Sequence, residues 1–157
     1  MSSPPQNRSA IAESEIGADR ELALLHIPAK MRKAFSALFG IDAAMGDVVA
    51  RSTDPALGRI KLAWWRERLE ALDSAAPPAE PRLIAAYEDL LPRGIKGAEL
   101  AELEAGWATL LDPEIDTELV AGRGALLFRL GARLLKASDP MIADAGRLGR
   151  MRVEPLG

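Results

Sequence analysis

Apolar residues recur every three or four positions along most of this 157-residue chain, and β-branched residues never alternate over a useful length. A first strong helix is predicted from Pro28, a favourable first-turn residue, to about Arg51. Four apolar residues share one face of this helix: Leu38, Ile41, Met45 and Val48. Because only 4% of residues are aromatic and alanine and leucine are abundant, composition also favours helix. The sequence therefore predicts an all-α fold.

Further helices follow from the same spacing and from start signals. Asp54-Pro55 and Asp112-Pro113 each combine a capping aspartate with a proline that suits the first helical position. The expected helices cover about 55–72, 82–91, 97–111 and 114–136, and a weaker one covers 140–151. The Pro- and Ala-rich stretch 73–81 is interpreted as a loop within one domain.

Inward faces can be assigned to three of these helices. In the second helix the apolar face is Leu57, Ile60, Trp64, Trp65 and Leu72. In 97–111 it is Leu100, Leu103, Trp107 and Leu110. In 114–136 it is Val120, Gly124, Leu127, Gly131 and Leu134. The two glycines of the last face, seven residues apart, predict a close approach to a neighbouring helix.

Length and composition indicate one domain and exclude several classes of protein. We expect a disordered N-terminus over 1–15, a helical domain over 16–151 and a tail over 152–157.

The chain has no cysteine and one histidine, so disulfides, thiolate catalysis and mechanisms with a histidine pair are excluded. The net charge of −3 predicts no nucleic-acid partner. We find no secretory signal and no run of about 18 apolar residues, so a cytoplasmic protein without a transmembrane segment is expected.

Two aspartates of the first helix call for an explanation. Asp42 lies among mostly apolar neighbours, and a lone buried carboxylate is costly, so it needs a partner. The candidates are Arg66 and Arg129. Asp47 faces the other way, and Arg51, four residues further on, is its expected partner.

Several arginines could hold a diphosphate through bidentate hydrogen bonds. They are Arg66, Arg68, Arg123, Arg129 and Arg133. Ordinary ion pairing on helix surfaces is the alternative and is favoured. By the same reasoning the Trp64-Trp65 pair is expected in the core rather than at a ligand, and the acidic residues of 114–118 are explained by the helix dipole.

Short motifs also occur in a recognisable order. They are Ala37-Leu38-Phe39, Asp54-Pro55 with Gly58, Trp64-Trp65-Arg66-Glu67-Arg68-Leu69, Pro92-Arg93-Gly94, Gly106-Trp107 and Gly124-Ala125-Leu126-Leu127-Phe128-Arg129-Leu130. On these motifs the chain resembles the squalene/phytoene synthase family over about residues 19–148. It looks especially like a divergent bacterial branch, which is similar to the mitochondrial complex I assembly factor of this family.

The resemblance implies a helical bundle of the isoprenoid synthase (terpenoid synthase) type, expected here to be shortened at its C-terminus. Enzymes of the family join two prenyl diphosphates head to head. Two aspartate-rich motifs hold magnesium, because hard cations bridged by carboxylates stabilise the departing diphosphate. The first motif, DDxxD, falls on 46–50, where Gly46 and Ala50 replace the outer carboxylates and Asp47 remains. We find no second motif before Gly157.

We therefore expect a non-catalytic binding or assembly protein with no metal or cofactor. Asp47 and Asp42 are remnant acidic positions of the catalytic site, and Phe39, Arg66 and Arg129 are candidate substrate-binding residues. The expected partners are a prenyl diphosphate or lipid chain, a protein, or a second copy of the chain, with peripheral membrane contact.

Two alternatives remain open. The first is an active head-to-head prenyl diphosphate transferase that completes its magnesium site by oligomerisation. The second is a shortened gene product that exposes an apolar face.

Overall fold

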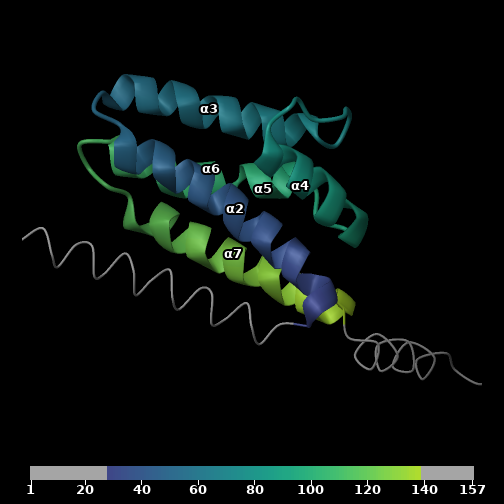
Figure 1. The fold of residues 1–157 in the computed structure, drawn as a ribbon. Coiled ribbons are helices and arrows are strands. Elements are labelled where there is room, and N and C mark those ends of the chain that lie inside the picture. Colours follow the sequence, from purple (N-terminus) through teal and green to yellow (C-terminus); the bar gives the residue numbers. More distant parts are fainter. Residues whose placement is uncertain (1–27, 139–157) are drawn as a thin grey trace, which may run out of the picture.

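The computed structural model describes residues 28–138, and every regular element in that range is a helix (Figure 1). The α-helices are α2 (Ala29–Arg51), α3 (Pro55–Ala71), α4 (Pro81–Asp89), α5 (Gly97–Ala101), α6 (Leu103–Ala108) and α7 (Thr117–Ser138), with 3-10 helices at Leu91–Arg93 and Thr109–Leu111. The all-α prediction is confirmed. The predicted disorder over 1–15, the helix over 140–151 and the tail over 152–157 lie outside the described residues. No helix within 28–138 has the length and apolarity needed to cross a membrane.

Helix α2 is the centre of the bundle, with α3 on one side and α7 on the other (Figure 1). Helices α4 and α6 also pack on α2, while α5 lies against α3 and α6 against α7. The predicted inward face of α2 is confirmed, because Leu38, Ile41 and Met45 are fully buried and Val48 is partly buried. Since α2 contacts four other helices, its side chains largely decide what the bundle encloses.

The predicted inward face of α3 is wrong in part. Trp65 and Leu72 are buried, but Leu57, Ile60 and Trp64 are 56%, 65% and 38% exposed. The face turned toward the other helices carries Gly58, Leu62, Trp65 and Leu69. Apolar residues surround more than half of this helix, so spacing alone could not select the buried side.

The start of α3 is confirmed and that of α7 is not. Asp54 caps α3, because its Oδ1 accepts a hydrogen bond from the Ala56 N–H at 3.0 Å. In contrast, α7 begins at Thr117, and its cap is Asp116, whose Oδ1 accepts from two backbone N–H groups of the first turn. The side chain of Asp112 is in an ion pair with Arg59 at 2.7 Å, so it does not cap a helix.

The helix predicted over 97–111 is interrupted. It consists of α5, a turn at Glu102, α6 and the 3-10 helix at its end. Leu100 and Leu103 are both fully buried although they lie on either side of the turn. The apolar spacing therefore continues across the break, which is why the sequence did not reveal it.

The inner face of α7 also differs from the prediction. The buried residues are Leu126, Leu130 and Leu134, so only Leu134 of the predicted set is fully buried. Gly124 is exposed, and a Cβ there would have no neighbour within 4 Å. A Cβ at Gly131 would make an ordinary contact with the Phe35 ring at 3.5 Å. The predicted close approach at these two glycines is therefore wrong.

The close approach to α7 is made instead by Gly106 of α6. A Cβ at this position would overlap the Cβ of Arg123 and lie 2.9 Å from the carbonyl oxygen of Leu119. Backbone and Cβ atoms cannot move aside as a flexible side-chain end can. Only glycine therefore lets α6 and α7 meet at this distance.

Helix α5 is joined by hydrogen bonds to the end of α3 and to α7. Asp73, after α3, accepts hydrogen bonds from the N–H groups of Gly97 and Ala98. Glu99 accepts from the Lys96 N–H and from the guanidinium of Arg133 on α7. Partial burial acts to raise the pKa of Glu99, but these two bonds and the positive charges of Arg133 and Lys96 outweigh it and lower the pKa.

We predict that Gly106→Ala lowers the free energy of unfolding by about 1–3 kcal/mol, because the added methyl group overpacks the α6–α7 contact. Gly124→Ala is the matched control. It has open space on α7, and loss of a mid-helix glycine should leave stability unchanged or raise it by up to about 1 kcal/mol. Urea unfolding of both variants checks this, and equal stabilities would contradict it.

Candidate functional site

The buried carboxylate of Asp42 lies where α2, α6 and α7 meet. Its side chain is 2% exposed. Oδ1 accepts a hydrogen bond from Nε1 of Trp107 at 2.9 Å and one from Nη1 of Arg123 at 2.7 Å. A buried charge needs an opposite charge and hydrogen bonds, and Asp42 has both.

Trp107 and Arg123 also contact each other. The guanidinium carbon of Arg123 lies 4.1 Å from the centroid of the Trp107 ring, in cation–π geometry. Arg123 is largely buried, with 20% of its side chain exposed. The three side chains form a closed polar cluster, and no buried side-chain nitrogen or oxygen of residues 28–138 lacks a hydrogen-bond partner.

The partners proposed for Asp42 from the sequence are therefore wrong. Arg66 lies on α3 at 3.8 Å from Glu104, and Arg129 is exposed on α7. The structure brings neither arginine to Asp42. A signal for the true partner existed, since Arg123 precedes Leu126 and Leu130 by three and seven residues and so shares their face.

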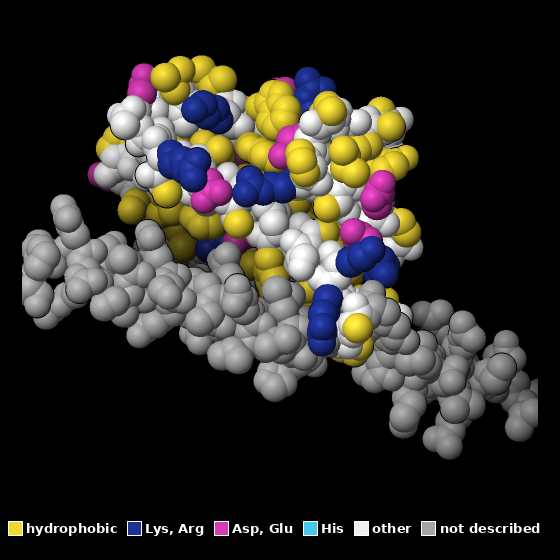
Figure 2. All heavy atoms as spheres, in the orientation of Figure 1, with side chains coloured by type: hydrophobic (Ala, Val, Ile, Leu, Met, Phe, Trp, Pro, Cys, Tyr) yellow, Lys and Arg dark blue, Asp and Glu magenta, His cyan; other side chains and the backbone are white. Residues whose placement is uncertain are grey.

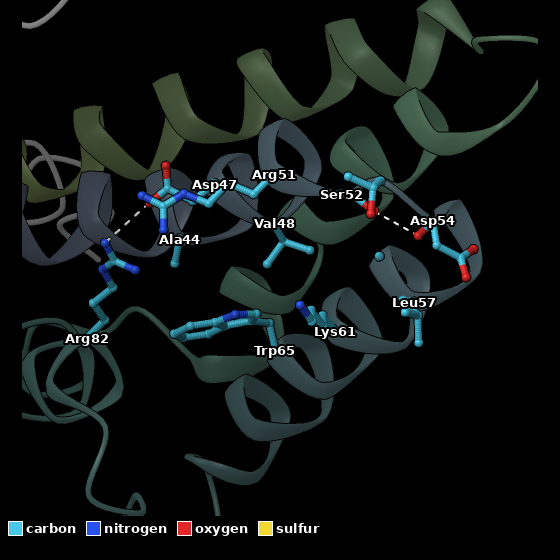
Figure 3. Close-up of a pocket in the computed structure, with 12 residues that line it drawn as sticks. Ala44, Asp47, Val48, Arg51, Ser52, Asp54, Leu57, Lys61, Trp65 and Arg82 are labelled. Atoms are coloured by element: carbon cyan, nitrogen blue, oxygen red, sulfur yellow. Dashed lines mark hydrogen bonds and ion pairs between the residues drawn. The ribbon is translucent and has the colours of Figure 1, made fainter.

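Positions 46, 47 and 50, aligned above with the acidic motif, point in different directions. Gly46 faces Trp107, and a Cβ there would lie 3.0 and 3.1 Å from two atoms of the indole ring. Ala50 is exposed. Asp47 is also exposed, and it forms an ion pair at 3.6 Å with Arg82 of α4 rather than the predicted pair with Arg51 (Figure 3).

An apolar groove opens beside the Asp42 cluster, between α2 and α7. It has a volume of about 430 Å³. Its lining residues are Phe35, Phe39, Gly124, Leu127, Phe128, Gly131, Ala132 and Leu135. Phe128 is 79% exposed. Among the described residues no charged side chain lines this groove, and of the binding residues predicted from the sequence only Phe39 does.

The arrangement of the acidic side chains decides whether the described residues can bind a metal ion. Within 28–138 no group of three or more histidine, aspartate or glutamate side chains is arranged to hold a metal ion. Asp42 and Asp47 are directed to different partners, Arg123 and Arg82. The described residues therefore do not fit the carboxylate cage that magnesium requires.

Comparison with known proteins identifies the family. A model of the squalene/phytoene synthase family matches residues 15–117, about two thirds of the chain, so the chain belongs to this family. Comparisons with curated proteins and with solved structures gave no match. The matched range contains α2 to α6, whereas Arg123 and the α7 wall of the groove lie beyond it.

We predict that Arg123→Leu lowers the free energy of unfolding by about 3–5 kcal/mol, because it leaves Asp42 buried without a compensating charge. The double variant Asp42→Leu with Arg123→Leu should recover part of this loss. Arg129→Leu, at an exposed position of the same helix, serves as control and should change stability by less than about 0.5 kcal/mol. Chemical denaturation measures all three, and a stable single variant would refute the prediction.

Proposed function

We propose that this chain is a non-catalytic member of its family that acts by binding, and that the apolar groove is its ligand site. The observation that carries the proposal is the position of Trp107. Its indole ring lies against Gly46, the position that the resemblance assigns to the first carboxylate of the family's acidic motif. No cofactor is needed for this function.

The electrostatics of the region support the same proposal. A divalent cation needs several carboxylate oxygens with uncompensated charge. The charge of Asp42 is already compensated by Arg123, and its Oδ1 also accepts from Trp107. Asp47 lies on another side of α2 with Arg82 beside it. A magnesium ion would therefore have to break the cluster that joins α2, α6 and α7.

The chemistry of the groove favours an apolar chain as ligand. Phe35 and Phe39 form one wall, with ring centroids 6.0 Å apart, and α7 forms the other. Burial of each methylene group from water contributes about 0.8 kcal/mol to the binding free energy. A prenyl or lipid chain has many such groups and would therefore bind this groove more strongly than a polar ligand. A hydrophobic helix of a protein partner, as in an assembly factor, or a second copy of the chain could use the same surface.

Absence of turnover is the first expected result. Purified full-length protein should not release diphosphate from farnesyl or geranylgeranyl diphosphate with magnesium present, because the outer carboxylates at 46 and 50 are missing. A continuous diphosphate assay checks this. Steady release that is lost in Asp42→Asn or Asp47→Asn would instead establish an active transferase, with its site completed by oligomerisation.

Binding in the groove is the second expected result. Gly124→Leu should weaken binding of farnesol at least tenfold, equivalent to about 1.4 kcal/mol, because the new side chain occupies the groove. Gly122→Leu is the matched control, since Gly122 also has open space but does not line the groove. Calorimetric titration measures both, and equal affinities would remove the groove as the binding site.

A further inference from the structure

A second pocket lies on another side of α2, at its seam with α3. It has a volume of about 380 Å³ and is open to solvent. Among the described residues its charged lining consists of three cations, Arg51 at the end of α2, Lys61 in α3 and Arg82 in α4, and two carboxylates, Asp47 and Asp54. Figure 3 shows Arg51 and Val48 on the α2 wall of this seam pocket and Lys61 and Trp65 side by side on the α3 wall.

The seam pocket carries excess positive charge. Arg82 is balanced by Asp47. The carboxylate of Asp54 accepts the Ala56 N–H and so caps α3. No acidic side chain of residues 28–138 forms an ion pair with Arg51 or Lys61. Capping does not remove the charge of Asp54, so three cations and two carboxylates leave an excess of one positive charge in the lining. Arg51 and Lys61 can together attract an anion with several oxygens, such as a phosphate group.

A row of exposed apolar side chains borders this pocket. It consists of Leu57, Ile60 and Trp64, three and four residues apart and therefore on one face of α3. Leu57 belongs to both the row and the pocket wall. Arg68 places its guanidinium 5.8 Å from the Trp64 ring centroid. In Figure 2, several Lys and Arg side chains lie over α2 and α3, beside hydrophobic ones.

We propose that this face docks on an anionic lipid bilayer, with a lipid phosphate in the seam pocket and the α3 row in the interface. A free phosphate would account for Arg51 and Lys61 but would leave Leu57, Ile60 and Trp64 exposed to water. A bilayer surface accounts for both the cations and the apolar row. Aromatic and apolar side chains enter the interfacial region, while cations attract anionic headgroups. This docking is independent of a ligand in the groove, which lies between α2 and α7.

Vesicle flotation of the full-length chain tests the proposal. The protein should float with vesicles of 70% phosphatidylcholine and 30% phosphatidylglycerol at low salt, and bind much less to pure phosphatidylcholine or in 0.5 M salt. Arg51→Gln with Lys61→Gln should lower binding about fivefold for each charge removed. The control pair Lys33→Gln with Lys136→Gln removes two exposed charges far from the pocket and should have a small effect.

Two further measurements test the contribution of the apolar row and the possibility that the pocket binds a soluble anion. Leu57→Asn with Ile60→Asn should also lower vesicle binding, because two apolar side chains of the row can then no longer enter the bilayer interface. Unchanged circular dichroism confirms folding of these surface variants. Absence of vesicle binding, or equal losses in the control pair, would overturn the proposal. Binding of inorganic phosphate without vesicle binding would also overturn it, and would assign the pocket to a soluble anion.

Discussion

The charge of Asp42 inside the bundle is the constraint on which the remaining arrangement depends. An ionised carboxylate that is 2% exposed is tolerated only when a cation and hydrogen-bond donors reach it. Arg123 and Trp107 meet that need from two different helices, so they fix how α6 and α7 lie on α2. The requirement for glycine at 106 follows, because the backbone of α6 must approach α7 closely for both side chains to converge.

Features that depend on nearby residues were predictable from the sequence. The inward face of α2 and the Asp54 cap of α3 were found because spacing and local hydrogen bonds determine them. The buried side of α3 was not, because apolar residues occupy several of its faces and only the neighbouring helices select one. For the site, the sequence showed that Asp42 needs a partner. The spacing of Arg123 from Leu126 and Leu130 was a signal for this partner, 81 positions away. It could not decide against Arg66 or Arg129, because the rotation of α7 selects which of its faces is buried.

Family membership and the arrangement of side chains around α2 can be described together in physical terms. The chain retains the helical bundle of the squalene/phytoene synthase family, and apolar packing around α2 maintains it. Around α2 the chain has two surfaces of different chemistry. The described lining of the groove toward α7 is apolar and uncharged, whereas the seam toward α3 holds charges of both signs with one positive charge in excess and is bordered by exposed apolar residues. Of the site residues proposed from the sequence, Phe39 lines the groove and Asp47 lines the seam pocket. Asp42, Arg66 and Arg129 line neither.

The contact between Gly46 and the indole of Trp107 has a consequence for how such a site could change. An aspartate at position 46 would place its Cβ 3.0 Å from the Trp107 ring, so the ring would have to shift by a few tenths of an ångström to admit it. Replacement of Trp107 first would remove a donor from Asp42 and the cation–π contact of Arg123. A paired acidic site on this part of α2 would therefore require coordinated substitutions on α2 and α6.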